Sequence, residues 1–402
     1  MTNDTFGLSG MAAYVPPYRV SLEQWCAWTG NDWEKVRAVV GHGFRLRSPR
    51  QDVYTLAANA ALRLILQYEL DPSRLGFLGL GTESSTDNAV GAIVIKGMLN
   101  ARLAELGLPL LPRDLQVPEF KHACLGGIYA LKDALRYVAF DGRGRQALVI
   151  SADCAVYARG SSGEATQGAG AVAMLVEQDP QLLEVDLLHA GSSSDYRGVD
   201  FRKPMRCGDV FSEFPVFNGK YSTQCYIDAV GQALNTMLAK LALQPQAYFD
   251  TISAAFLHRP YKKLPYTALP GCAAKLALGQ GVMMELGNLY TAALPAWLAA
   301  GLEEACESDI ALGALLAIGY GSGDAAEALP LHVAANWRAR VPRMTQVLAG
   351  AIDLTQAQYM ALHAGDAHAV PVPHGFVTER FGNSNGPDLY DRGVAYYAYH
   401  AS

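Results

Sequence analysis

The chain of 402 residues lacks an excess of charge of either sign, a paired set of cysteines and a long hydrophobic run. Its formal net charge is −6, and its basic residues are scattered apart from short groups such as "RKPMR" and "RPYKK". A basic surface for nucleic acid is therefore not predicted. The seven cysteines are odd in number, widely spaced and free of any CxxC pair. This pattern argues against a disulfide framework or a metal site of the zinc type, and it predicts a reducing cytoplasm.

No segment is apolar for long enough to cross a bilayer, and the N-terminus has neither a basic start nor an apolar signal core. We therefore expect no membrane association. Half of the residues are hydrophobic (50%) and 17% are charged, which indicates a globular chain with one large core or two moderate ones.

Short apolar runs alternate with longer helical patterns along the chain, as in layered α/β proteins. The predicted buried strands are "LGFLGLGTE", "QALVISADCAV", "AGAVAMLVE", "TISAAFLH" and "GALLAIGYGSG". The predicted helices include "DVYTLAANAALRLILQYEL", "TQCYIDAVGQALNTMLAKLAL" and "YTAALPAWLAAGLEEACE". In each half one strand runs into a polar residue, Glu83 in the first and His258 in the second, which hints at an internal duplication.

A cysteine and two glycines precede a helical pattern in "FKHACLGGIYALKDALRYV". Apolar residues recur there at spacings of three and four, so Cys124 is expected at a helix start. Unpaired backbone N–H groups and the helix dipole would favour a thiolate there. Gly126 and Gly127 would allow close approach of an acyl group or of a neighbouring backbone. The alternative is a buried structural cysteine.

Other polar residues add to the case for a reactive thiol. Glu83 ends an apolar run and could exchange protons at the edge of an apolar pocket, although a turn glutamate fits equally well. His258 leaves an apolar strand just before Lys262 and Lys263, which suits a phosphorylated or thioester ligand. Asn288 stands at a probable helix start, where an N-cap is the plainer interpretation.

Taken in order, the motifs resemble the 3-hydroxy-3-methylglutaryl-CoA synthase family of thiolase-like condensing enzymes. The similarity spans roughly residues 8 to 330 and includes "GTESSTDNAVGAI", "HACLGGIYALKDAL", "DFRKPM", "FPVFNGKYSTQCYIDA", "HRPYKKL" and "YGSGDAAE". The resemblance implies a five-layered αβαβα fold of two similar halves, residues 1–180 and 181–402, and a homodimer. The first half would carry the Glu and Cys of the site, and the second would carry the His and Asn, together with family-specific extensions.

The resemblance also implies roles at matching positions. Cys124 would take an acetyl group from acetyl-CoA, Glu83 would act as general acid and base, and His258 would position acetoacetyl-CoA. Supporting positions are Asn288, Asp153, Asp200 and Ser322, and coenzyme A contacts are Lys263, Lys262 and Thr166. The implied reaction joins acetyl-CoA, acetoacetyl-CoA and water, serves the mevalonate or a related branched-chain route, and needs no metal or other cofactor.

Two leucines depart from the family pattern. Leu125 and Leu257 stand where relatives usually carry aromatic residues, and both are expected to border the acyl pocket. A widened pocket would suit a longer β-ketoacyl thioester or an acceptor carried by an acyl carrier protein, which is the second hypothesis. A third is a non-catalytic acyl-CoA-binding homologue, although Glu83, Cys124 and His258 are all present.

Overall fold

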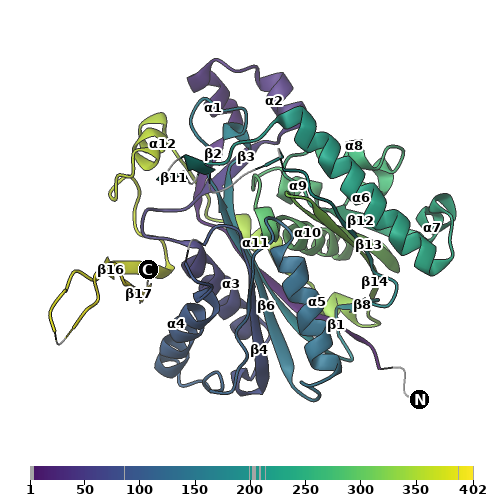
Figure 1. Cartoon of the computed structure of the whole chain (residues 1–402), viewed down its shortest axis with the longest axis horizontal. Coiled ribbons are helices and arrows are strands. Elements are labelled where there is room, and N and C mark those ends of the chain that lie inside the picture. The colour runs from purple at the N-terminus through teal and green to yellow at the C-terminus, as the bar shows by residue number, and fades with distance from the viewer. Residues whose placement is uncertain are drawn as a thin grey trace.

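Figure 1 shows the computed structural model of the chain, which describes residues 4–85, 87–198, 200–201, 205–207, 210–212, 214–387 and 389–401. Residues 202–204, within the "DFRKPM" motif, lie outside the described residues. None of the helices in the described part of the chain is both long and apolar enough to cross a bilayer.

Two sets of strands repeat one pairing pattern. The first set comprises β1 (Phe6–Tyr14), β4 (Leu75–Gly81), β6 (Gln146–Ala155) and β7 (Gly168–Gln178). The second comprises β9 (Gly191–Ser194), β12 (Ile252–Leu257), β13 (Ala314–Gly321) and β14 (Ala325–Val333). β4 runs parallel to β6, β6 antiparallel to β7 and β7 antiparallel to β1, and β12, β13, β14 and β9 repeat this order. The duplication expected from the sequence is present in the strand topology.

A short strand joins the two sets. β8 (Leu183–Val185) pairs with β1 on one side and with β14 on the other, so one hydrogen-bonded sheet runs through both halves. Because one continuous sheet runs through both halves, the structure marks no domain boundary of its own. The division into domains at residue 180 therefore stays a prediction.

Helices cover and separate the two parts of the sheet (Figure 1). α3 (Val53–Gln67) packs on β1, β6 and β7, with α4 (Gly91–Glu105) beside it, and α6 (Gly219–Leu241) packs on β9, β13 and β14. α5 (Gly126–Ala139) and α10 (Ala293–Glu307) contact strands of both halves. The layers are therefore helix, sheet, helix, sheet and helix, which confirms the predicted fold class.

Smaller elements complete the chain. They are β2 (Tyr18–Ser21), α1 (Leu22–Thr29), α2 (Trp33–Val39), β3 (Gly43–Leu46), η1 (Pro72–Arg74), β5 (Glu119–Phe120), η2 (Glu164–Thr166), β10 (Met205–Cys207), β11 (Val210–Ser212), α7 (Pro245–Thr251), α8 (Leu264–Ala268), η3 (Ala273–Leu276), α9 (Gln280–Met283), η4 (Tyr290–Ala292), η5 (Trp337–Arg340), α11 (Met344–Leu348), β15 (Ile352–Asp353), α12 (Gln356–His363), β16 (Gly375–Phe381) and β17 (Ala395–His400). β16 and β17 form a hairpin that projects from the body at the left of Figure 1.

The five predicted strands and the predicted helices are all found, whereas β14 was not predicted. Its sequence "AAEALPLHV" is rich in alanine and contains Pro330, and both residue types are depleted in strands. The neighbouring strands decide its conformation, since it is paired with β13 along its whole length and also with β8 and β9.

Glycines let the first turn of α5 approach β4. A Cβ at Gly81 would lie 2.2 Å from the backbone nitrogen of Gly127, and a Cβ at Gly127 would lie 2.0 Å from the Ser151 hydroxyl oxygen. Both distances are far below van der Waals contact. Two reasons for Gly126 and Gly127 follow from the sequence: close approach of an acyl group, or close approach of a neighbouring backbone. The second reason is sufficient to explain the glycines at this contact.

A buried ion pair connects the two halves. The Lys132 ammonium on α5 lies 2.5 Å from Glu327 Oε2 on β14, and the Ser192 hydroxyl donates to the same oxygen at 2.8 Å. The side chains are 10% and 4% exposed. Such a pair adds little net stability, but removing one partner leaves the other charge buried without compensation.

Replacing Lys132 by methionine should lower the free energy of unfolding by about 3–5 kcal/mol, because Glu327 loses its cation. Urea denaturation measures the loss. The double variant Lys132→Met/Glu327→Met should recover most of it. As a control, Arg37→Met removes an exposed partner of Glu34 and should cost less than about 1 kcal/mol. Equal losses in Lys132→Met and Arg37→Met would contradict the prediction.

Candidate active site

Cys124 lies in a tight turn just before α5. Ala123 adopts a left-handed backbone conformation with φ of 42°, and the Leu125 N–H donates to the His122 carbonyl at 2.9 Å. The helix begins at Gly126, so the cysteine precedes its first turn by two residues. The thiol is largely buried, with 9% of the residue exposed. Its sulfur lies 3.5 Å from Glu83 Oε2, which places a carboxylate within proton-transfer reach of any group bound to the sulfur.

The Asp153 carboxylate fixes the loop that carries Glu83 through hydrogen bonds. Oδ1 accepts hydrogen bonds from the Thr82 hydroxyl at 3.0 Å, the Glu83 N–H at 2.9 Å and the Ser84 hydroxyl at 2.7 Å. Oδ2 accepts from the N–H and hydroxyl of Thr291, at 2.9 and 2.7 Å. Since Thr291 lies at the start of the α10 region, one fully buried carboxylate holds both halves of the site together.

His258 follows β12 directly, at the position that corresponds to the end of β4 in the first half. The backbone N–H of His258 donates to the Ile318 carbonyl at 2.8 Å, and the backbone carbonyl of His258 accepts from the Tyr226 hydroxyl at 2.7 Å. Burial lowers the pKa of the imidazole to about 3, so the ring is neutral at neutral pH. Its Nδ1 is buried and has no hydrogen-bond partner among the described residues.

Asn288 and Thr166 are joined through the backbone. The Asn288 N–H donates to the Thr166 carbonyl at 3.0 Å, and the Asn288 side-chain oxygen accepts from the Tyr290 N–H at 2.9 Å. Asn288 is not the N-cap expected from the sequence, because Leu289 caps η4; its side chain instead bonds the backbone two residues on, and the residue lines the cavity described next.

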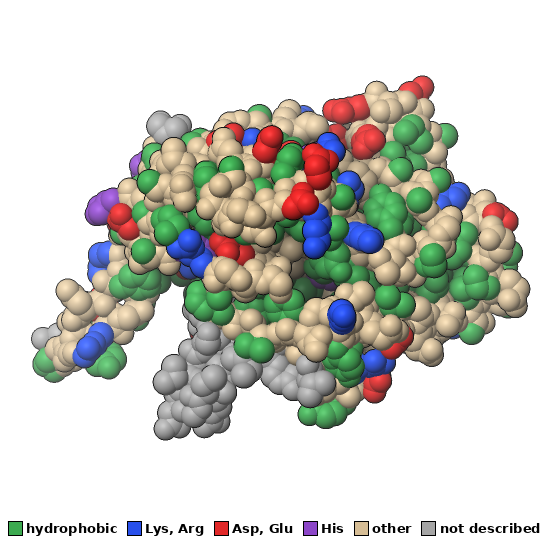
Figure 2. Space-filling view, turned by 90° about the horizontal axis from the view of Figure 1, so that it is seen from above, with side chains coloured by type: hydrophobic (Ala, Val, Ile, Leu, Met, Phe, Trp, Pro, Cys, Tyr) green, Lys and Arg blue, Asp and Glu red, His purple; other side chains and the backbone are tan. Residues whose placement is uncertain are grey.

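A cavity of about 300 Å³ extends from Cys124 and His258 toward the surface. Its walls include Asn288, Thr166 and Ser322 and four aromatic side chains, Tyr157, Phe201, Phe217 and Tyr290. The aromatic rings contact one another at centroid distances of 6.0–6.4 Å. In Figure 2 the molecule is hollowed near the middle of the face seen from above, with hydrophobic side chains in the hollow and Lys or Arg side chains near its edge. The cavity suits a short acyl group on a long, flexible carrier.

Lys262 and Lys263 lie beside the cavity mouth and not in its wall. Their backbone N–H groups donate to the carbonyls of Val40 and Val39, at 3.1 Å each. Both valines line the cavity. The Lys262 side chain is half-buried and that of Lys263 is exposed, so both ammonium groups can reach an anionic ligand that enters the mouth.

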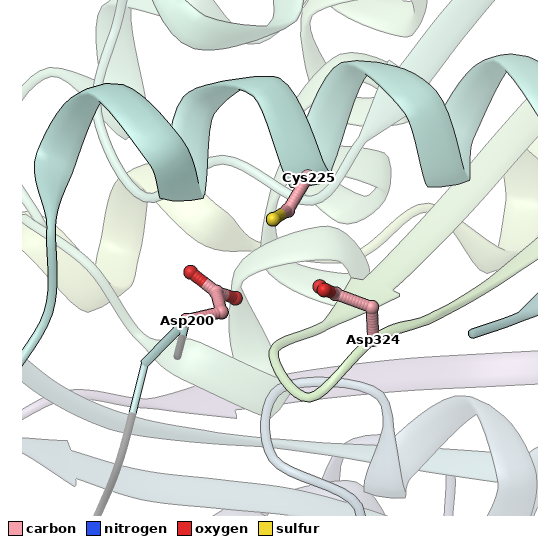
Figure 3. Close-up of side chains that lie close together, drawn as sticks. All are labelled: Asp200, Cys225 and Asp324. Atoms are coloured by element: carbon pink, nitrogen blue, oxygen red, sulfur yellow. The ribbon is translucent and has the colours of Figure 1, made fainter. Parts of the chain in front are cut away.

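Asp200 lies behind the cavity with two further ionisable side chains (Figure 3). Asp200 accepts hydrogen bonds from the hydroxyls of Ser222 and Tyr320, the latter at 3.2 Å. Asp324 accepts from the same Tyr320 hydroxyl. Together with Cys225 these carboxyls form a compact buried group whose ligand atoms lie within 4.8 Å of one another.

The widened pocket expected from Leu125 and Leu257 is not found. Both side chains are fully buried in the hydrophobic core, and neither is among the described residues that line the cavity. Leu125 packs against β13, where a Cβ at Gly319 would lie 2.7 Å from its Cδ1 atom. The departures from the family pattern therefore alter core packing and leave the acyl pocket bounded by aromatic rings.

The aromatic walls, Thr291 and the Tyr320–Asp324 pair were not predicted from the sequence. The aromatic residues stand in apolar surroundings, where a core position is the usual outcome. Asp324 carried a signal, because it opens the apolar run "AAEALPL" with a charge.

Replacing Asp153 by asparagine should lower the free energy of unfolding by roughly 2–4 kcal/mol, because an amide N–H₂ would face buried donors that need an acceptor. Chemical denaturation measures this. Asp114, an exposed partner of Arg145, provides the matched control, and Asp114→Asn should leave stability nearly unchanged. A wild-type value for Asp153→Asn would refute the role of Asp153 as the link between the halves.

The neutral state of His258 predicts a pH-dependent stability. The folded pKa of about 3 lies below the unfolded value, so the unfolded state binds a proton first and stability falls as the pH drops below about 6.5. Between pH 7 and 4.5 the residue should account for a loss of roughly 2–3 kcal/mol. His258→Gln should lack this part of the loss when urea denaturation is compared at the two pH values. Parallel pH dependences would show that the ring is not held neutral.

Two family models match the chain: hydroxymethylglutaryl-coenzyme A synthase N terminal over residues 3–181 and C terminal over residues 193–271. The hydroxymethylglutaryl-CoA synthase of Haloferax volcanii is 34% identical over 259 residues, which cover 62% of this chain and 51% of that protein. That of Enterococcus faecalis is 29% identical over 379 residues, covering 90% of this chain and 92% of that protein. The chain thus spans about half the length of some curated relatives and nearly the whole of another.

Comparison with solved structures points to the same family as the sequence comparisons. The structure of MvaS in complex with 3-hydroxy-3-methylglutaryl coenzyme A superimposes with a TM-score of 0.85 at 27% identity, with both chains fully covered. The HMG synthase of the curacin biosynthetic pathway, solved with apo donor-ACP, has a TM-score of 0.79 at 18% identity, covering 98% of this chain and all of that one, and shows a shared fold. Since the two family models together cover more than half of the sequence, the chain belongs to the hydroxymethylglutaryl-CoA synthase family.

Proposed function

We propose that the protein condenses acetyl-CoA with acetoacetyl-CoA and water to give 3-hydroxy-3-methylglutaryl-CoA and CoA, through an acetyl group carried on Cys124. The observation that carries the proposal is the 3.5 Å contact between the Cys124 sulfur and Glu83 Oε2 beside a cavity that also holds a neutral histidine. Family membership supports the same reaction.

The first step is acetyl transfer. The Cys124 thiolate attacks the thioester carbonyl of acetyl-CoA, forms the acetyl-cysteine thioester and releases CoA. The aromatic walls exclude water from the acetyl group, and the rim lysines, Lys262 and Lys263, pair with the phosphates of coenzyme A. Thr166, in the wall near the mouth, contacts the pantetheine portion.

The second step forms the carbon–carbon bond. The Glu83 carboxylate removes a proton from the acetyl methyl group, and the resulting enolate attacks the ketone carbon of acetoacetyl-CoA. His258 donates a hydrogen bond to the acceptor and orients it, which requires the neutral imidazole that burial produces. The protonated Glu83 then returns its proton to the new tertiary alkoxide, and water hydrolyses the cysteine thioester. These steps call for no metal or redox cofactor.

We further propose a cytoplasmic homodimer that serves the mevalonate or a related branched-chain route. Exposed apolar side chains support the dimer: Val90 and Ile93, at 47% and 58% exposure, lie at the start of α4, and Leu110 lies beyond its end. The start of α4 is bonded to β5, where Glu119 accepts from the Gly91 N–H, and β5 occupies one end of the sheet and leaves an edge to be covered. Light scattering of the purified protein decides between monomer and dimer.

An acceptor on an acyl carrier protein is not favoured. That hypothesis drew on a pocket widened at Leu125 and Leu257, and both side chains are buried in the core. The aromatic walls instead fit a short acceptor such as acetoacetyl-CoA.

Incubation with acetyl-CoA alone should add one acetyl group to Cys124, detected by intact mass and peptide mapping, because the thiol needs no acceptor for the first step. Adding acetoacetyl-CoA should consume the adduct and release CoA. Cys124→Ala should form no adduct, whereas Cys26→Ala, which removes another buried cysteine, should behave as the wild type. Glu83→Gln should still form the adduct but condense at least about a hundredfold more slowly, since it has no base.

Two other outcomes identify the alternatives. An adduct that persists in the presence of acetoacetyl-CoA would move the acceptor to a longer chain or a carrier protein. Absence of any adduct under all conditions would support a non-catalytic acyl-CoA-binding protein.

A further inference from the structure

Two buried carboxyls share one tyrosine hydroxyl behind the cavity. The Tyr320 oxygen lies 3.2 Å from Asp200 Oδ2 and in contact with Asp324 Oδ1. Asp200 and Asp324 are each 2% exposed. Figure 3 shows the two carboxyls pointing toward each other below Cys225, which comes from α6.

The Tyr320 hydroxyl can satisfy only one of the two carboxyls at a time. Tyr320 has a single hydroxyl proton and cannot donate it to both carboxylates. Ser222 donates to the other oxygen of Asp200. Burial raises the pKa of Asp324, the hydrogen bonds from Tyr320 and Cys225 and the charge of Arg197 lower it, and the nearby Asp200 raises it further, so that the net shift is upward. With a proton on Asp324, each contact acquires a donor: Asp324 donates to the Tyr320 oxygen, and Tyr320 donates to Asp200.

A bound cation would satisfy the same carboxyls less well. The Arg197 guanidinium is already present, with Nε 3.9 Å from Asp324 Oδ2, and would repel a metal ion. Burial raises the pKa of Cys225 to about 11, so its sulfur stays protonated and is a poor ligand at neutral pH.

Tyr320 connects this network to the reaction site. Its ring stacks on the His258 imidazole, with centroids 6.3 Å apart and planes inclined by 28°, and both residues line the cavity. Burial raises the pKa of Tyr320, so the hydroxyl keeps its proton throughout the neutral range. A ring anchored at its hydroxyl leaves the imidazole beside it little freedom to tilt.

We propose that Asp324 in its acid form is a positioning residue: it anchors Tyr320 between two carboxyls, and Tyr320 holds His258 in the orientation that binds the acceptor thioester. The proposal rests on the proposed function, in which His258 contacts acetoacetyl-CoA. Asp324 itself touches no reacting atom, and it acts on condensation and not on acetyl transfer, because Glu83 is fixed separately through Asp153 and Cys124 by the turn before α5.

The protonation state of Asp324 also depends on the other charged and titratable groups around it. Three elements pack against it: β13, α6 and the segment that follows β9. The titratable and charged groups that they bring are Tyr320, Cys225, Asp200 and Arg197, together with Asp195 and Asp228, which pair with Arg197 at 3.3 and 3.1 Å. Arg197, 3.9 Å from Asp324 Oδ2, favours the Asp324 carboxylate but shares its charge with Asp195 and Asp228, whereas burial and Asp200 favour the acid form.

Asp324→Ala should raise the KM for acetoacetyl-CoA in the condensation assay by roughly tenfold, while the rate of Cys124 acetylation changes less than about twofold. Asp324→Asn should restore the wild-type KM, because its amide donates to Tyr320 as the acid does. In the wild type, condensation should weaken at alkaline pH as Asp324 ionises, and Asp324→Asn should lack this decline. Asp114→Ala, which removes an exposed partner of Arg145, is the matched control and should leave both half-reactions unchanged.

Infrared spectroscopy supplies a test that does not depend on activity. The wild type at pH 7 should show the carbonyl band of a buried protonated carboxyl, which Asp324→Asn lacks and Asp114→Ala keeps. If Asp324→Ala does not fold, Tyr320→Phe replaces it and should show the same selective rise in KM.

Three results would overturn the proposal. They are equal losses in Asp324→Asn and Asp324→Ala, equal losses in acetylation and condensation, or absence of the protonated-carboxyl band. A wild-type protein that forms no acetyl adduct would refute the proposed function instead, and the infrared band would still decide the protonation of Asp324.

Discussion

The arrangement of the site depends on the Asp153 carboxylate. Its two oxygens bind donors from different halves of the chain, the loop after β4 on one side and the start of the α10 region on the other. A carboxylate can do this because it accepts on both oxygens at once and carries no donor of its own. Full burial makes each of these hydrogen bonds costly to lose, so the relative position of the halves is closely defined.

The duplicated topology explains why the reacting groups meet. β4 and β12 occupy equivalent positions, and each delivers one ionisable residue at its carboxyl end, Glu83 and His258. The two inner helices begin beside these strand ends, so the turn before α5 presents Cys124 and the turn before α10 presents Asn288. The site is thus assembled from two copies of one strand–turn–helix arrangement facing each other.

Much of this arrangement could be predicted from the sequence, and the exceptions share a cause. Glu83 and His258 end apolar runs, where a polar residue needs a reason, and Cys124 stands out because two glycines follow it at a helix start. Tyr157 and Phe217 interrupt no apolar run. The sequence therefore cannot distinguish an aromatic residue in the cavity wall from one in the core, and only the folded chain shows the difference. Leu125 was wrongly placed in the pocket for the same reason. The link through Asp153 joins residues that are far apart in the chain, and pairings of this kind follow from topology and not from local pattern.

Two backbone segments at the mouth of the cavity are hydrogen-bonded to each other. The carbonyls at the end of α2 accept from the backbone N–H groups of Lys262 and Lys263, so the segment near residue 40 and the segment after His258 form one backbone-paired unit. A carrier molecule that enters here therefore passes a part of the entrance that two backbone hydrogen bonds tie together. The start of α6 and the turn before η2 also line the cavity, and no backbone hydrogen bond among the described residues ties them to the paired segments, so any widening of the entrance falls to them.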